Sequence, residues 1–146
     1  IGLFIMVKGL EIQGILDLVG TLMIDISGGN VLILSLMLIW VVGIASSFMG
    51  AVPIVTTLIP IIFFIQKNLG ITDINVLWWS MSLGACLGGN GTIFGTATTM
   101  VTVSLTRKRK ENKITFFNFI KVAYPVMIIS LIISSLYIYI FYFLLR

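Results

Sequence analysis

Residues 84–95 read Gly84-Ala-Cys-Leu-Gly-Gly-Asn-Gly-Thr-Ile-Phe-Gly95, and they interrupt an otherwise apolar stretch from Val76 to Leu105. As one straight helix this stretch would measure about 45 Å, whereas the hydrocarbon core of a bilayer is roughly 30 Å thick. Each glycine also costs about 1 kcal/mol of helix propensity relative to alanine. The sequence therefore predicts a membrane crossing that is broken at Gly88-Gly89-Asn90-Gly91-Thr92, where unwound backbone can hold an ion.

The composition places this chain in a lipid bilayer. Apolar residues make up 59% of the sequence, charged residues make up 10%, and the mean hydropathy is +1.17. Such a chain is expected to be an integral membrane protein with an all-α fold, because helices satisfy their own backbone hydrogen bonds in lipid. Its length suffices for about four membrane-embedded elements, which is few for a complete transporter. Since the chain also opens at Ile1 without a methionine, we expect a piece of a longer protein.

Positive charge is concentrated in one stretch. The formal net charge is +4, and six of the nine lysines and arginines fall within residues 107–121. Apolar segments flank this stretch on both sides, and short basic loops beside membrane spans remain cytoplasmic. We therefore expect residues 106–121 to form a cytoplasmic loop of a prokaryotic cell membrane protein, not a nucleic-acid site. Counting crossings from this loop places the carboxyl terminus outside.

Residue types needed for catalysis or for a resident metal are missing. The sequence has no histidine, and Cys86 is its only cysteine, so neither an internal disulfide nor a cysteine–histidine metal cluster can form. A nucleophilic serine or cysteine would need a neighbouring base, and the sequence places none near one. We therefore expect neither an enzyme nor a cofactor, apart from a coupling Na⁺ or H⁺.

The first part of the chain is expected to finish one span and then to follow the membrane surface. Residues 1–7 read as the end of a span. Residues 8–28 place Glu11, Asp17 and Asp25 among apolar residues at helical spacing, which suits an amphipathic helix in the interface. A second span that contains acids is the alternative.

Residues 31–65 are apolar again, with small residues between Ser46 and Pro53. One straight helix of this length would measure about 52 Å, too long for the bilayer core. Two full spans need about 20 residues each, and the second arm, Pro53 to Ile65, has only 13. The lengths therefore predict a re-entrant hairpin with its tip at residues 49–53, buried in protein or facing water.

Two crossings complete the predicted topology. Residues 66–75 carry charged side chains and are expected in water on the outside. The broken crossing covers residues 76–105, with Trp78 and Trp79 at its start as part of an aromatic belt. The last span covers residues 119–145, is loosened at Pro125 and ends in aromatic residues.

The hairpin tip and the helix break are expected to form one site. Both force polar backbone into the membrane, where half-helix ends and free carbonyls hold an anion or sodium. Asn90 and Thr92 would add oxygen ligands from the break, and Ser46 and Ser47 would add them near the tip. The alternative is helix packing, because residues 84–88 and 91–95 each have glycines four apart. Spacing alone leaves both interpretations open.

Three segments resemble one known family. Residues 84–95 look like GACLGGNGTLIG, the signature of the arsenite permease and NhaD-type sodium/proton antiporter branch of the ion transporter superfamily, a branch with P-protein-like, citrate transporter-like domains. Residues 46–60, SSFMGAVPIVTTLIP, are similar to SAFVDNIPFTATMIP, and residues 3–16 resemble LFVLIGALEETGLI. The order of these segments matches the carboxyl-terminal half of such a transporter.

The resemblance implies one half of an inverted-repeat fold, with an interfacial helix, a re-entrant hairpin, a broken transmembrane helix and a final transmembrane helix. It also implies an elevator-type transporter, usually a homodimer, whose substrate and coupling ion lie between both halves. The implied partners are the missing amino-terminal half, a second copy and the lipid bilayer. A sodium ion would lie near Ser47, Asn90 and Thr92. The substrate and ion site would comprise Ser46, Ser47, Gly50, Ala51, Gly89, Asn90, Gly91, Thr92 and Thr99.

Departures from the family pattern concern this site. Gly50-Ala51 stands where the branch has Asp-Asn or Asn-Asn, and Thr99 stands where its GASANVV segment has asparagine. No carboxylate in this half could then carry a coupling proton at mid-membrane. We expect a secondary active ion transporter of the arsenite or anion permease type or the sodium/proton antiporter type. A citrate or dicarboxylate carrier ranks below these only through the resemblance, since no arginine is placed to clamp a carboxylate, and a degenerate, non-transporting paralogue or scaffold is the alternative.

Overall fold

The structure is a computed structural model that describes residues 2, 5, 8–9, 12–70, 74–108 and 115–144, without the side chains of residues 16, 107, 108 and 143. No strand occurs in these ranges, so the predicted all-α fold is confirmed. The elements are α2 (Ile15–Ser27), α3 (Val31–Met49), α4 (Ala51–Leu69), α5 (Asn75–Gly88), α6 (Ala97–Lys108), α7 (Phe116–Ile138) and the π-helix η1 (Tyr139–Leu144).

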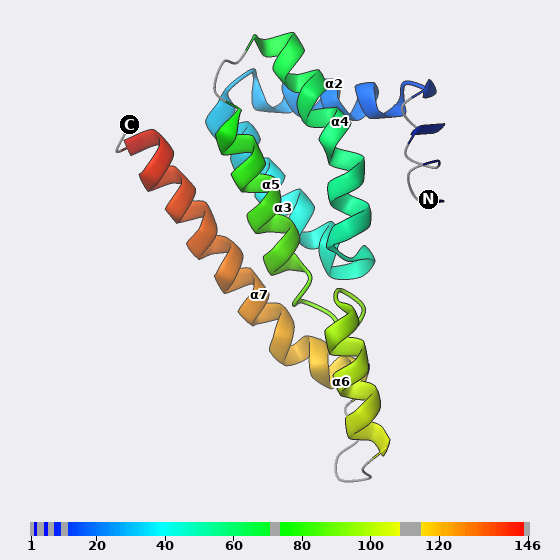
Figure 1. The fold of residues 1–146 in the computed structure, drawn as a ribbon. Coiled ribbons are helices and arrows are strands. Elements are labelled where there is room, and N and C mark those ends of the chain that lie inside the picture. Colours follow the sequence, from blue (N-terminus) through cyan, green and yellow to red (C-terminus); the bar gives the residue numbers. More distant parts are fainter. Residues whose placement is uncertain are drawn as a thin grey trace.

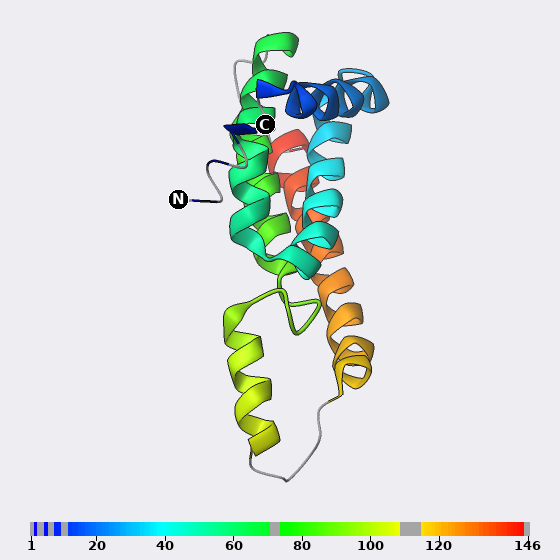
Figure 2. The ribbon, with the colours of Figure 1, turned by 90° about the vertical axis from the view of Figure 1, so that its right-hand side faces the viewer.

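Helices α3 and α4 form the predicted hairpin. The Asn30 side chain caps α3 by accepting a hydrogen bond from the Leu32 amide at 3.0 Å. The hairpin turns at Gly50, whose φ of 81° lies in the region that favours glycine. Figures 1 and 2 show the turn lying beside the irregular segment between α5 and α6, far from the open end of the hairpin.

The second arm of the hairpin is longer than predicted. α4 has 19 residues, as α3 has, because it continues through Gln66 to Leu69 and ends at Gly70, where φ is 60°. The helix thus continues past Ile65, the predicted end of the hairpin, because polar side chains do not interrupt a helix, whereas a left-handed glycine ends it. Residues 31–49, 51–69 and 116–142 are each long and apolar enough to cross a membrane. Arm length alone therefore does not exclude two full spans.

The broken helix comprises α5 and α6, with an irregular segment at residues 89–96 that is longer than the predicted glycine run. α5 lies beside α3, and α6 continues away from the hairpin (Figure 1). α7 and η1 run alongside α3 and α5 and extend past the level of the break. α7 remains helical through Pro125, so the predicted loosening there does not interrupt it, and the backbone widens into a π-helix at Tyr139 instead.

Helix α2 lies across the open end of the hairpin (Figures 1 and 2). It begins at Ile15, later than predicted, because Gly14 with φ 71° ends the preceding turn. It packs closely on α4, since a Cβ at Gly20 would lie 2.7 Å from Phe64 Cδ1. The predicted span end at residues 1–7 falls mostly outside the described residues, as do Glu11, Asp73 and three of the six basic residues within 107–121.

Three faces run along α2. The face on α4 contains the buried Met23 and Ser27. The acids Asp17 and Asp25 are exposed and lie with Thr21 on a second face. A third, apolar face is also exposed, at Ile15, Leu18, Val19, Leu22 and Ile26. The helix can therefore pack sideways on α4 while it meets lipid with one face and water with another.

Helices α3 and α5 pack with their backbones in contact. A Cβ at Gly84 would lie 2.8 Å from the Ile39 carbonyl oxygen, and a Cβ at Gly88 would lie 2.6 Å from Gly43 Cα. The Gly84-x-x-x-Gly88 spacing therefore serves helix packing, one of the two interpretations left open above. The buried residues around this contact are Leu38, Ile39, Val42, Leu77, Met81, Ala85, Met127 and Leu131.

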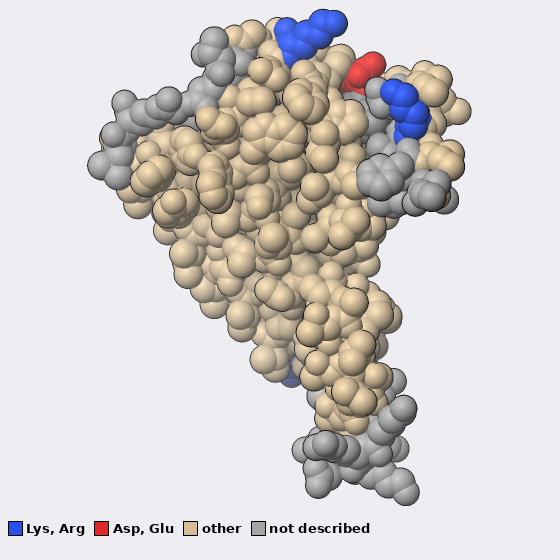
Figure 3. All heavy atoms as spheres, in the orientation of Figure 1, with Lys and Arg blue, Asp and Glu red and all other residues tan. Residues whose placement is uncertain are grey.

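Charged side chains avoid the middle of the surface. On the face shown in Figure 3, the charged side chains of described residues lie toward the ends of the molecule, and a broad uncharged region separates them. Large exposed apolar side chains cover α7, including Val122, Ile129 and Leu136. This distribution suits a protein whose middle is surrounded by lipid.

Candidate functional site at the hairpin tip and the helix break

The hairpin tip is built around Gly50. Its amide donates to the Ser46 carbonyl at 2.9 Å and so closes the last turn of α3. α4 starts at the next residue, Ala51, and no side chain caps its amino terminus. The free amides of this first turn therefore carry the partial positive charge of a helix amino terminus at the tip.

The break is a series of tight turns. The Asn90 amide donates to the Leu87 carbonyl at 3.2 Å, and the Gly91 amide donates to the Gly88 carbonyl at 2.9 Å. The segment then folds back on itself, because a Cβ at Gly95 would lie 2.9 Å from Gly89 Cα. Gly91 and Gly95 thus pack within the break and against its neighbours, where a larger residue would not fit.

Two hydroxyl groups join the end of α3 to its neighbours, one to α5 and the other to the break. Ser46 Oγ donates to the Ala85 carbonyl oxygen of α5 at 2.7 Å. Thr92 Oγ1 donates to the Ser47 carbonyl oxygen of α3 and also accepts a hydrogen bond from the Phe94 amide at 3.2 Å. The structure therefore brings these predicted residues together, as expected for a single site.

The predicted ligands differ in accessibility. Ser46 and Ser47 are 0% exposed and Thr92 is 1% exposed, and all three hydroxyls donate to backbone carbonyls, with Ser47 Oγ donating to Ile44 O. Asn90 is exposed, and its side chain forms no hydrogen bond with the described residues. Gly50 and Ala51 are half-buried, whereas Gly89 and Gly91 are buried. Asn90 is thus the polar side chain of this set that can reach a ligand.

Thr99 is separate from the tip and belongs to the start of α6. Its hydroxyl lies 2.6 Å from Thr96 Oγ1, and its amide donates to the same oxygen at 3.2 Å. Thr96 thereby caps α6 and also lies close to Gly89, whose Cβ would be 3.1 Å from Thr96 Cγ2. Thr96, like Thr99, is one of the hydroxyl residues that follow the break in the sequence, and the structure uses its hydroxyl to cap a helix.

The site lies near the middle of the longest apolar span. Met127 packs against Gly91, its sulfur being the atom nearest to where a Gly91 side chain would be. The apolar span of α7 and η1 covers 27 residues, Phe116–Tyr142. Met127 therefore lies about 3 Å from its centre, at about 1.5 Å per residue. No pattern in the sequence indicates the part that Met127 plays.

Among the described residues, the acidic groups lie away from the tip. The acids with described positions, Asp17 and Asp25, belong to α2 at the open end of the hairpin. The described residues contain no group of three or more histidine, cysteine or acidic side chains that could hold a metal. Ligands from this half would therefore be amides, hydroxyls and backbone groups, which suit a small anion or an alkali cation.

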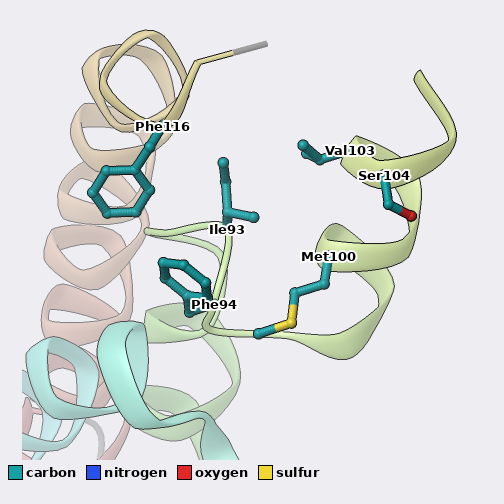
Figure 4. Close-up of a pocket in the computed structure, with 6 residues that line it drawn as sticks. All are labelled: Ile93, Phe94, Met100, Val103, Ser104 and Phe116. Atoms are coloured by element: carbon teal, nitrogen blue, oxygen red, sulfur yellow. The ribbon is translucent and has the colours of Figure 1, made fainter. Parts of the chain in front are cut away.

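A pocket of about 370 Å³ lies beside the break, between α6 and the start of α7 (Figure 4). Its lining is apolar except for Ser104, whose hydroxyl donates to the Val101 carbonyl of its own helix. None of the predicted site residues lines it. The lining residues are Ile93, Phe94, Met100, Val103, Ser104 and Phe116.

Comparisons with known proteins show that this chain is similar to members of a membrane transport family. The sequence model of a family described as citrate transporter matches residues 1–84. The P protein of Mus musculus is 32% identical over 102 residues, which cover 69% of this chain and 12% of that protein. An uncharacterized transporter of Synechocystis sp. is 24% identical over 151 residues, which cover 93% of this chain and 33% of that protein.

A 46 kDa membrane protein of Mycobacterium leprae is 28% identical over 142 residues, which cover 97% of this chain and 33% of that protein. The chain therefore spans a third or less of the length of these relatives. No solved structure matches it.

Proposed function

The chain belongs to the citrate transporter family, and we propose that it supplies one half of the substrate pathway of a secondary active transporter. Family membership and the apolar helices identify an integral membrane protein and agree with the expectation that it is not an enzyme. One observation carries the proposal: the hairpin tip and the helix break meet near the centre of the α7 span and expose Asn90 there. A polar amide at this depth needs a polar partner, which a transported ion supplies.

The proposed topology makes the α3–α4 hairpin re-entrant. α6 extends about 18 Å beyond the break, at about 1.5 Å per residue. Beyond the break, α6 and the start of α7 carry exposed apolar side chains outside the basic loop, namely Leu105 at 56% exposure and Val122 at 70%. A tip at the bilayer surface would place these side chains in water. A tip inside the bilayer keeps them in lipid, with the basic loop at 106–121 cytoplasmic and the carboxyl terminus outside.

We assign the cargo to the class of small anions, as in an arsenite or anion permease. The uncapped amino terminus of α4 and the Asn90 amide are attractive to an anion, and no acid is placed near the tip among the described residues. This half therefore supports an anion permease better than a sodium/proton antiporter, which needs a carboxylate at mid-membrane. The family description names citrate, so citrate belongs in the test alongside arsenite and sodium.

Flux measurements test the proposal. The full-length protein in proteoliposomes should move arsenite, citrate or ²²Na⁺ against an imposed gradient. Asn90→Ala should lower the established flux about tenfold or more, because one polar ligand is lost. Ser104→Ala is the matched control, since Ser104 is exposed and bonds only to its own helix. Absence of flux for all three probes would favour the non-transporting paralogue, and unchanged flux in Asn90→Ala would remove Asn90 from the site.

A further inference from the structure

Thr92 joins the break to the α3–α4 hairpin through a hydrogen bond. Its hydroxyl donates a hydrogen bond to the Ser47 carbonyl oxygen, and its oxygen accepts one from the Phe94 amide. The side chain is 1% exposed. A buried hydroxyl that already donates its hydrogen bond within the protein has little capacity left to bind a transported ion. The family signature at Thr92 thus corresponds here to a contact within the chain.

Asn90 lies between two places at which hydrogen bonds hold the break to neighbouring helices. On one side, the Asn90 and Gly91 amides donate to the last carbonyls of α5. On the other side, Thr92 fixes the chain to α3 two residues later. Between them the Asn90 side chain is exposed and bonds to none of the described residues.

We infer that Thr92 is a positioning residue that presents Asn90, not a ligand of the transported ion. Ser46 assists, because its hydroxyl holds the same stretch of α3 to Ala85 of α5 at 2.7 Å. An asparagine side chain that faced lipid at this depth would lack hydrogen-bond partners, which costs free energy. Holding Asn90 in a fixed position is therefore useful only if it faces a polar partner. The inference rests on the proposed function, in which that partner is the cargo.

The test measures the position of residue 90 without transport. In full-length protein lacking Cys86 and other native cysteines, Asn90→Cys is reconstituted in proteoliposomes and labelled with a small maleimide, with no arsenite, citrate or sodium present. Thr92→Val, which keeps the shape but removes the hydroxyl, should change the labelling rate about three- to tenfold, the effect of one lost hydrogen bond. Thr92→Ser, which keeps the hydroxyl, should remain within about twofold of the parent.

A second measurement uses the same threonine variants with Asn90 intact. Thr92→Ser should retain flux of the established probe, and Thr92→Val should lose it. Loss of flux in Thr92→Val with an unchanged labelling rate in the Asn90→Cys background would overturn the inference and make Thr92 a direct ligand. If Thr92→Val does not fold, Ser46→Ala takes its place, and an unchanged labelling rate there would equally count against the positioning role. A protein without flux of any probe contradicts the proposed function, while the labelling still decides the role of Thr92.

Discussion

Gly88→Ala should destabilise this protein more than any other alanine substitution at a glycine on the α3–α5 contact. The new Cβ would lie 2.6 Å from Gly43 Cα and closer still to the Gly43 carbonyl oxygen, whereas ordinary contacts begin at 3.4 Å. Because both groups belong to helix backbones, no side chain can rotate away to make room. The helices must separate by about 1 Å, and overpacking of this kind costs about 1–3 kcal/mol or more.

The separation has a second effect at the site. Ser46 follows Gly43 by one helical turn, and Ala85 precedes Gly88 by one turn. Moving the helices apart by about 1 Å would lengthen the Ser46–Ala85 hydrogen bond from 2.7 Å to beyond the usual limit. Loss of that bond adds about 0.6–1 kcal/mol. We therefore expect a total destabilisation of about 3 kcal/mol in Gly88→Ala.

Gly43→Ala is the matched control, because it adds the same methyl group to the α3 residue that Gly88 meets, but the methyl group points toward α7. The atoms nearest to its Cβ would belong to the Leu131 side chain, 2.8 Å away at Cδ1, and the end of a leucine side chain can shift. We expect a smaller loss of about 1 kcal/mol. Thermal challenge of the full-length protein in detergent, followed by size-exclusion chromatography, ranks the two variants. Equal stability of Gly88→Ala and wild type, or a larger loss in Gly43→Ala, would refute the close backbone contact.

Three further predictions concern the membrane. A spin label on Val126→Cys, which is exposed and adjacent to Met127, should report a depth within a few ångströms of the bilayer centre in oxygen and nickel accessibility measurements; an interfacial depth would contradict the re-entrant tip. Single cysteines at Asn30 and Lys67 should react with an impermeant reagent from the same side of the membrane, and reaction from opposite sides would rule out the hairpin. On α2, Leu22→Asp should destabilise the protein in nanodiscs by about 1 kcal/mol, because it places a charge on the exposed apolar face of the helix. Thr21→Asp, on the face that carries the acids, should leave stability unchanged. Equal effects of the two substitutions would contradict the interfacial position of α2.

Much of the fold was predictable because lipid imposes few solutions. Apolar length, turn residues at Gly28 and Gly50 and the glycine run at the break are sufficient to predict the helix order from residue 15 onward. Helix ends were less predictable. α4 passes through Gln66 and Lys67 because neither side chain opposes helix formation, and hydropathy reports where lipid ends, which differs from where the helix ends.

The candidate site was predictable by residue type and less so by role. Hydroxyls near glycines in an apolar run indicate polar contacts, but spacing does not distinguish a contact to an ion from a contact to a backbone carbonyl. Ser46, Ser47 and Thr92 bond to carbonyls of the chain, and this depends on the approach of α3 to α5. That approach is a tertiary property, set by Gly84 and Gly88 meeting α3.

The two interpretations of the glycine-rich break, helix packing and an ion site, therefore apply to different residues and depend on each other. Gly84 and Gly88 remove the side chains that would hold α5 away from α3, and only at that distance can Ser46 reach Ala85 and Thr92 reach Ser47. These bonds use up the hydroxyls but leave Asn90 exposed near the centre of the α7 span. Gly50 and Ala51 contribute no side chain to these hydrogen bonds, which use backbone carbonyls of α3 and α5. The proposed presentation of Asn90 therefore depends on the close packing of α3 and α5, and not on polar side chains at the tip.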